Sequence, residues 1–249
     1  LLGFFAVLLL LSGVFMRLGG FSTGEAANVE AFQEYAQPVE RLTIPEGKKI
    51  IALGEATHGN AEFQQLKLDV FKKMVEDYHV RGFALEGDFG GCEQVNRYIH
   101  GGEGTAQEAA AAIGFSIYRT EEMAALISEL RQYNSSASAG EDIRFYGFDM
   151  QRVSHTFRLL MEACMELNID TTRLEMLVDG DKLNPALDFP TQAEILSQVK
   201  NALRTSAASE QVMHCADMLL QYCQLQSIPS SDGGAVRDRF MAENVKWIL

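Results

Sequence analysis

Apolar residues predict three short strands and one long helix in the first half of the chain. We expect strands at residues 49–54, 82–86 and 143–149, in the runs KKIIALGE, RGFALEGD and IRFYGFD, because each is a short apolar run beside polar turn residues. From Asn60 to Tyr78, apolar residues recur every three or four positions, which is typical of an amphipathic helix with Asn60 as its cap. Strand, helix and strand in succession predict a βαβ unit, with a parallel sheet and a right-handed crossover.

Helical patterns occupy most of the remaining sequence. A long helical stretch separates the second and third predicted strands. Residues 152–249 show only helical patterns, with turns at Pro185, Pro190 and residues 227–234. The expected fold class is α/β, with a mostly parallel sheet flanked by helices, a helical insertion over residues 152–234 and an incomplete sheet in this length of chain.

The first 16 residues are uncharged and almost wholly apolar, and Arg17 with two glycines follows them. As a helix they rise about 24 Å, less than the roughly 30 Å of a bilayer core. We expect residues 1–26 to be a signal peptide, cleaved after Ala26 or Ala27, or an uncleaved membrane anchor. A buried core helix is the remaining alternative. A signal peptide predicts an exported protein, and an anchor predicts a protein held at the membrane by this segment alone. In both cases residues 27–249 are expected to be the folded domain.

Composition and charge narrow the class of protein. The 249 residues are 47% hydrophobic and 22% charged, which excludes a disordered or collagen-like chain. The formal charge is −13, so the field of the protein repels phosphate backbones and anionic lipid headgroups, and we expect no nucleic-acid partner. The four cysteines lack metal-site spacing and are expected to be buried thiols. A Cys215–Cys223 bridge stays open if the chain is exported, although the helical spacing does not favour it.

Each predicted strand carries a carboxylate at its carboxyl end. Glu55 follows the first strand, Glu86 and Asp88 end the second, and Asp149 ends the third. Ligands of open parallel sheets bind at this edge, so the four side chains are expected to converge on one crevice. The alternative for Asp88 and Asp149 is that they cap the helices that follow, a role for which glutamate is poorly suited.

His58 is the best catalytic candidate among the five histidines. It lies three residues after Glu55, in the turn between the first strand and the helix, from which its side chain can reach the crevice. A neutral imidazole beside carboxylates suits a general base that activates water. The other four are expected to be surface or structural histidines: His79, His100, His155 and His214.

Lys67 places a cation in the middle of the apolar stripe of the helix that follows His58. At 100° per residue it falls between Met74 and Tyr78 on the apolar face. Lysine is rarely buried without a partner, so we expect it to reach back toward the carboxylates. The alternative is a lysine that extends past its neighbours into solvent.

Several common catalytic motifs are missing from the sequence. It contains no GxSxG, GxxxxGK[ST] or GxGxxG motif, so the α/β-hydrolase, P-loop and dinucleotide-binding classes have no support. Glu55, His58 and Glu62 lie close together in sequence, but without a second histidine nearby they are only a weak indication of a metal site. We therefore expect no metal and no cofactor.

Four motifs, taken in order, resemble those of the erythromycin esterase family. They are GEATHGNAEFQQLK, GFALEGDFGGCEQVNRYIHGG, FYGFDMQ and RDRFMAENVKWIL, and the resemblance covers residues 47–249. It implies hydrolysis of an ester, in the best-known members the macrolactone of erythromycin. It also implies a metal-independent route in which a histidine activates water.

The resemblance assigns roles by position. It implies that His58 is the catalytic base, Glu55 an acidic partner, Glu86 an active-site glutamate and Lys67 a cation at a position often occupied by arginine. Lysine keeps the charge but lacks the bidentate fork of arginine. The resemblance also implies a second active-site histidine, in an HN-x-H stretch beyond Leu249. We therefore expect this chain to be part of a longer protein, active at full length and inactive as shown.

The expected partner is a small-molecule ester or a macrolide, and hydrolysis of a macrolide would confer antibiotic resistance. His58 would take a proton from water, Lys67 would stabilise the oxyanion, and Asp88 and Asp149 would contact the substrate. Two alternatives stay open. One is an exported hydrolase of another ester, such as a substituent of an envelope polysaccharide. The other is a metal-binding or haem-binding relative without esterase activity.

Overall fold

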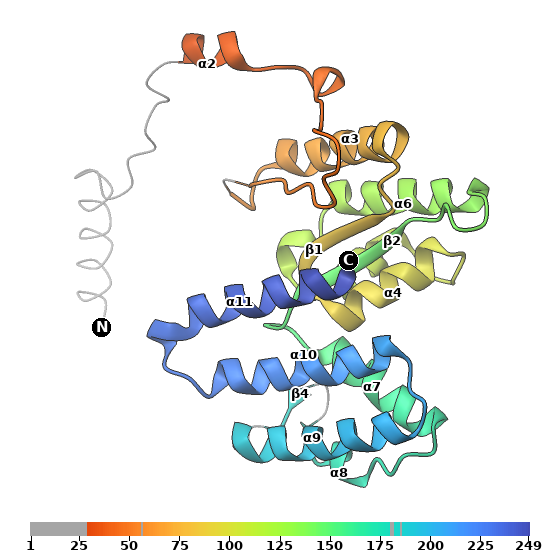
Figure 1. The fold of residues 1–249 in the computed structure, drawn as a ribbon, viewed down its shortest axis with the longest axis vertical. Coiled ribbons are helices and arrows are strands. Elements are labelled where there is room, and N and C mark those ends of the chain that lie inside the picture. The colour runs from red at the N-terminus through yellow and green to blue at the C-terminus, as the bar shows by residue number, and fades with distance from the viewer. Residues whose placement is uncertain (1–28, 56, 180–181, 185) are drawn as a thin grey trace, which may run out of the picture. The chain divides into compact units, whose positions relative to one another are not determined.

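The computed structural model describes residues 29–55, 57–179, 182–184 and 186–249 (Figure 1). The chain divides into two compact units, Leu1–Ile44 and Pro45–Leu249. In the first unit, helix α2 spans Val29–Tyr35 and the short 3₁₀ helix η1 spans Val39–Arg41. The predicted leader, residues 1–26, lies outside the described residues. Among the helices that are described, none has the length and apolar character needed to cross a membrane.

The second unit is a mixed α/β structure, mostly helical, built on a small parallel sheet. Strands β1 (Gly82–Asp88) and β2 (Arg144–Asp149) pair in parallel, with Phe83 opposite Phe145. The helices between them form the crossover (Figure 1). This confirms a parallel sheet, because the second and third of the three predicted strands form and run in the same direction. The βαβ unit predicted over residues 49–86 does not form among the described residues, because its first strand is missing. The sheet has two strands in the described part of the chain, so it is incomplete, as expected.

The prediction of a strand at residues 49–54 is wrong. These residues belong to no strand in the structure, and the side chains of Ile50 and Leu53 are about half exposed, at 54% and 47%. An extended apolar run becomes a strand only when a neighbouring backbone accepts and donates its hydrogen bonds. Within the described residues this run pairs with no strand, so its apolar composition alone does not make it one.

Helices make up most of the rest of the second unit. They are α3 (Ala61–Tyr78), α4 (Phe89–Ile99), α5 (Ala106–Ala112), η2 (Ser116–Tyr118), α6 (Glu121–Ser136), α7 (Ser154–Glu166), α8 (Thr172–Glu175), α9 (Phe189–Thr205), α10 (Glu210–Gln226) and α11 (Ser230–Ile248). Three details differ from what the sequence predicts. Pro190, expected in a turn, lies in the first turn of α9, while Pro185 lies outside the described residues. A two-residue antiparallel pair, β3 (Val178–Asp179) and β4 (Lys182–Leu183), interrupts the helical region. The expected turn at residues 227–234 is shorter, because α11 already begins at Ser230 after Pro229, whose fixed φ suits a helix start.

Two hydrophobic clusters hold the second unit together. One lies around the sheet and packs its strands against α3, α4, α5 and α6, with the rings of Phe83 and Phe145 5.1 Å apart. The other joins α7, α9, α10 and α11. Every fully buried large apolar side chain contributes about 1.5–3 kcal/mol to folding. All four cysteines are buried and free, as the sequence predicted, and burial raises their pKa values above the usual thiol range.

Candidate active site

The turn before α3 brings Glu55 and His58 together. Nδ1 of His58 lies 3.2 Å from Oε2 of Glu55. The turn is held by a hydrogen bond of 2.8 Å from the hydroxyl of Thr57 to the side-chain oxygen of Asn60, the residue that precedes α3. His58 is 53% exposed while Glu55 is 13% exposed, so the imidazole is open to solvent and its carboxylate partner is not. A base placed in this way can meet water and a substrate.

Two side chains of α3 complete the surroundings of Glu55. Lys67 donates from Nζ to Oε2 of Glu55 at 3.2 Å, and Gln64 donates to Oε1 at 3.1 Å. Lys67 also donates to the amide oxygen of Gln64 at 3.1 Å. The three side chains therefore form a closed triangle, and both oxygens of the carboxylate are used. Lys67 is 11% exposed, so it reaches back to a carboxylate as expected, and the alternative of a lysine extended into solvent is wrong.

A second cluster forms where the two strands end. Arg237 of α11 makes a two-pronged contact with Asp149 at the end of β2, with bonds of 3.2 Å to Oδ1 and 2.9 Å to Oδ2. The same guanidinium lies 3.7 Å from Oε2 of Glu86 on β1. Asp149 is fully buried, so Arg237 supplies the countercharge that burial requires. These hydrogen bonds raise the pKa of Arg237 further above its usual value.

Asp88 has a structural position at the end of β1. Its carboxylate accepts from the backbone N–H groups of Gly90, His155 and Thr156. The first is at the start of α4 and the other two are at the start of α7, so one buried side chain caps two helices. Burial raises the pKa of Asp88, and the hydrogen bonds from Thr156 and His155 oppose this rise. Asp88 therefore acts as a helix cap, which was the alternative expected for it. A contact between Asp88 and the substrate stays a prediction.

The glycines after Asp88 allow this close packing. A Cβ atom on Gly90 would lie 2.3 Å from the backbone nitrogen of Thr156, and one on Gly91 would lie 1.8 Å from the carbonyl oxygen of Ala112. Both distances are far inside van der Waals contact. The first turn of α4 can therefore press against α7 and α5 only because the sequence after Asp88 is Phe-Gly-Gly.

Tyr118 is a buried phenol on which carboxylates of both clusters act. Its ring is buried at the end of η2. Burial raises the pKa of the phenol, and the negative charges of Glu86 and Glu55 raise it further. Asp149 adds to the same effect. Carboxylates of both clusters therefore influence the same phenol.

Three residues of this region were not predicted from the sequence: Gln64, Tyr118 and Arg237. Two of them carried a readable signal. Gln64 lies three residues before Lys67 on the same helix face. Arg237 precedes the buried Phe240 and Asn244 of α11 by three and seven residues, so it lies on the buried face, as Lys67 does in α3. Tyr118 carried no comparable signal, because it lies in a short irregular segment.

The four carboxylates were expected to converge on one crevice, but they have separate sets of partners. Glu86 and Asp149 meet at Arg237, and Glu55 meets Lys67. Asp88 turns toward α7 instead. No three histidine, cysteine or acidic side chains gather in a metal-binding arrangement in the part of the chain that the structure describes.

A family model and a curated relative both match this chain, and both carry the description erythromycin esterase. The sequence model of the family described as erythromycin esterase matches residues 75–249, most of the chain. This range includes Glu86, Asp149 and Arg237, and begins after Lys67. Erythromycin esterase type II of Escherichia coli is 27% identical over 239 residues, which cover 81% of this chain and 56% of that protein.

Two crystal structures have the same fold. One is a Bacillus cereus protein and the other is described as a succinoglycan biosynthesis protein. Each has a TM-score of 0.66 and 21% identity, and covers 78% of this chain and 52% of the other. The chain therefore spans about half the length of the relatives that it matches.

Proposed function

Because the chain belongs to the erythromycin esterase family, we propose that the protein is a hydrolase that cleaves a carboxylic ester with water. We further propose that His58 is the general base and that a macrolactone such as that of erythromycin is one substrate. The Escherichia coli relative, named an erythromycin esterase, supports this choice of substrate.

One observation carries the proposal. Glu55 contacts the imidazole of His58 and the ammonium of Lys67 with the same oxygen, Oε2, at 3.2 Å in both cases. A carboxylate that accepts from Nδ1–H keeps Nε2 unprotonated and orients the ring. An exposed imidazole held in this way, with a cation beside it, suits water activation followed by stabilisation of an oxyanion.

The proposed reaction balances without a covalent intermediate. Nε2 of His58 takes a proton from water as the water oxygen bonds to the ester carbonyl carbon. The electron pair of the carbonyl moves to its oxygen, and the third N–H of Lys67, beyond those that meet Glu55 and Gln64, stabilises that oxyanion. Collapse of the tetrahedral intermediate breaks the bond to the alkoxide. His58 returns the proton to the alkoxide, which leaves an acid and an alcohol.

The second cluster has a supporting role in the proposal. Arg237 neutralises the buried Asp149 and lies near the more exposed Glu86. Glu86 is therefore the carboxylate of this cluster that is open to a substrate. We propose that it orients water or a hydroxyl group of the substrate, while Asp149 and Asp88 hold the strand ends in place.

A second candidate is hydrolysis of a different ester, such as an acyl substituent of an envelope polysaccharide. The succinoglycan-related name of one structural neighbour is compatible with it, although at 21% identity that likeness supports the fold alone. The chemistry at His58 would be the same. The two candidates differ only in the substrate that is placed at His58.

The test is an assay of the protein expressed from its complete reading frame without residues 1–26. Erythromycin and an O-acetylated polysaccharide are each incubated with the protein. Mass spectrometry follows the gain of one water by the macrolide or the release of acetate by the polysaccharide. Gain of water that is lost in His58→Ala supports the macrolide proposal, and acetate release with the same dependence supports the second candidate.

His79 provides the matched control, because it is an exposed histidine at the end of α3. His79→Asn should keep full turnover, since asparagine tolerates the left-handed backbone at this position (φ 54°). Turnover by His58→Ala equal to that of the unchanged protein would disprove the assignment of the base, whichever ester is hydrolysed.

A further inference from the structure

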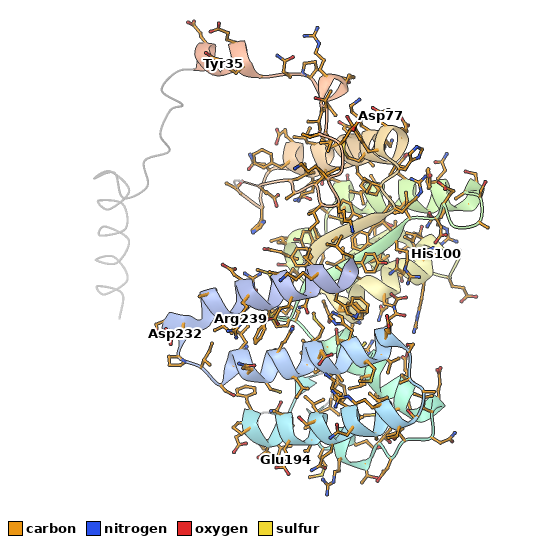
Figure 2. All side chains as sticks on the ribbon, in the orientation of Figure 1. Tyr35, Asp77, His100, Glu194, Asp232 and Arg239 are labelled. Carbon is orange, nitrogen blue, oxygen red and sulfur yellow. The ribbon has the colours of Figure 1, made fainter. Side chains whose placement is uncertain are left out.

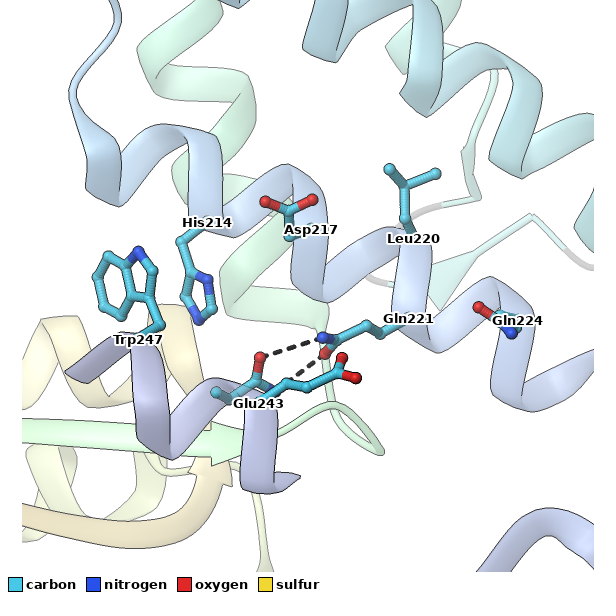
Figure 3. A pocket seen from close by; sticks show the side chains of 8 residues that line it. His214, Asp217, Leu220, Gln221, Gln224, Glu243 and Trp247 are labelled. Carbon is cyan, nitrogen blue, oxygen red and sulfur yellow. Dashed lines mark hydrogen bonds between the residues drawn. The ribbon is translucent and has the colours of Figure 1, made fainter. Parts of the chain in front are cut away.

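A pocket of about 380 Å³ opens between α10 and α11. His214, Asp217 and Gln221 line it from α10, and Glu243 and Trp247 line it from α11 (Figure 3). Its volume lies within the roughly 300–1,000 Å³ that is common for small-molecule sites. The lining residues are different from those of the candidate active site, so this is a separate feature of the molecule.

Aromatic rings form one wall of the pocket. The imidazole of His214 stacks on the indole of Trp247, with centroids 4.0 Å apart and planes within 3°. Phe89 meets both rings edge-on, at 4.9 Å and 5.5 Å. The imidazole is thereby fixed in orientation, and Trp247 stays 37% exposed at the edge of the pocket. The wall offers a rigid apolar surface beside polar groups.

His214 also carries an unused polar atom. The residue is only 5% exposed, and its Nε2 has no hydrogen-bond partner among the residues that the structure describes. Buried polar atoms of native proteins nearly always have a partner. Burial lowers the pKa of His214 to about 4, so the ring is neutral at pH 7 and each nitrogen is either a donor or an acceptor. A hydroxyl group can partner Nε2 in both cases, once the side chains that now cover this atom shift enough to open it to the pocket.

The charges around the pocket are already compensated. Asp217 pairs with Lys200, and Glu243 lies 4.0 Å from Arg239 on the same helix. A cationic ligand would therefore have to compete with a resident cation at each carboxylate. An anionic ligand would meet two acidic side chains. An uncharged ligand meets neither obstacle, and the carboxylate oxygens can still accept from its hydroxyl groups.

The amide of Gln221 adds both kinds of hydrogen bond. It exchanges a donor and an acceptor with the amide of Asn244, at 3.1 Å and 2.9 Å. Asn244 also donates to the carbonyl of Phe148 on β2, which fixes this pair in place. The Gln221 amide retains a second N–H and a second lone pair, so it can meet a hydroxyl group from either side.

We propose that the pocket between α10 and α11 is a second binding site, which takes an uncharged ligand with several hydroxyl groups and an apolar face, the chemistry of a sugar ring. The apolar face lies along Trp247, and a hydroxyl group completes the hydrogen bonding of His214. The proposal goes beyond the proposed hydrolysis and does not depend on it.

Trp247 makes the test direct, because it is the sole tryptophan of the sequence. Its fluorescence is followed while methyl α-D-glucopyranoside or methyl β-D-galactopyranoside is added, with tetramethylammonium and acetate as charged probes. We expect a saturable change with at least one glycoside and none with the charged probes. Saturation with a charged probe alone, or with no probe at all, would overturn the proposal.

A variant assigns the site. His214→Phe keeps a flat ring against Trp247 but removes Nε2, so the glycoside should bind about tenfold more weakly, which is the loss of one hydrogen bond. His79→Asn changes an exposed histidine outside the pocket, and this variant should bind the glycoside as tightly as the unchanged protein. Equal binding by His214→Phe contradicts the role of Nε2. If His214→Phe does not fold, the ¹⁵N signals of the unchanged protein decide: one of the five histidines must shift with the same saturation curve.

Discussion

Oε2 of Glu55 lies 3.2 Å from Nδ1 of His58, across the turn that precedes α3. A carboxylate can only accept, so this contact holds the hydrogen on Nδ1 and leaves Nε2 as the base. In Glu55→Gln the amide can also donate, and the preference for this tautomer is lost. We expect turnover of the ester to fall about 10²–10⁴-fold, the usual contribution of a general base. Steady-state hydrolysis of the best substrate measures this.

The control for that variant is Glu62→Gln, in the first turn of α3, where the side chain is exposed. It removes a carboxylate seven residues from Glu55, on the helix that carries Lys67, and should leave turnover unchanged. If Glu55→Gln and Glu62→Gln both retain full turnover, the carboxylate is not what prepares His58.

Gln64 is expected to act as a positioning residue. It is buried, and it bridges Oε1 of Glu55 and Nζ of Lys67. Gln64→Leu keeps the apolar packing of α3 but opens the triangle, so Lys67 loses its fixed direction toward the oxyanion. We expect kcat to fall about tenfold with a smaller change in KM, because the lost interaction acts in the transition state. Gln65→Leu, on the exposed face of the same helix, should change neither value.

How well each part of the site could be predicted depends on the distance in sequence between the residues involved. Lys67 was predicted to reach a carboxylate because helical periodicity is local and showed a cation on an apolar face. It contacts Glu55, twelve residues away, although the strand that was expected to position Glu55 does not form. The side chains of α3 hold Glu55 in place without it.

Longer-range contacts gave no such signal. Arg237 meets Asp149 over a separation of 88 residues, and no periodicity connects them. The strand at residues 49–54 failed for the same reason, since a strand depends on a partner that the local pattern does not specify. β1 and β2 were predicted correctly because their partner is present and their side chains are buried between helices.

Arg237 is expected to stabilise the strand ends through its paired bonds with Asp149. Arg237→Lys keeps the charge but forms only one of the two bonds, so the free energy of unfolding should fall by about 1–2 kcal/mol. Arg237→Met leaves the buried Asp149 without a countercharge and should cost about 3–5 kcal/mol. Urea unfolding followed by circular dichroism measures both.

Arg239, labelled in Figure 2, is the matched control on the same helix. It is exposed and lies 4.0 Å from Glu243. Arg239→Lys should change the free energy of unfolding by less than about 0.5 kcal/mol, as surface substitutions usually do. Equal effects of Arg237→Lys and Arg239→Lys would show that the paired contact with Asp149 contributes nothing to stability.

Asp88 and Asp188 both cap helices, but one is buried and the other exposed, so we expect substitution by asparagine to affect stability only at Asp88. Asp88 is buried and accepts from three backbone N–H groups through both of its oxygens. In Asp88→Asn the new NH₂ group faces an N–H, so we expect a loss of about 1–3 kcal/mol. Asp188 is exposed and accepts from the backbone N–H of Thr191 at the start of α9. Asp188→Asn should be nearly neutral, since asparagine caps helices equally well. Thermal and urea unfolding of the two variants compare them.

His214 predicts that the protein loses stability in mild acid. Burial lowers the pKa of this imidazole to about 4, below the ordinary value of 6.5 that it has in the unfolded chain. Between these two values the unfolded state binds a proton that the folded state does not. The free energy of unfolding must therefore fall as the pH is lowered from about 6.5 toward 4, by about 2 kcal/mol at pH 5 from this group.

His214→Phe separates this contribution from those of other groups that titrate in the same range. Phenylalanine can keep the stack on Trp247 and the edge contact with Phe89, but it binds no proton. Urea unfolding at pH 5 and at pH 7.5 should show a smaller difference for His214→Phe than for the unchanged protein, by about 2 kcal/mol. His79→Asn, which changes an exposed histidine, should show the same difference in the free energy of unfolding between the two pH values as the unchanged protein. If His214→Phe also retains that difference, the imidazole is protonated in the folded state, and the buried, neutral ring that lines the pocket between α10 and α11 is not present in solution.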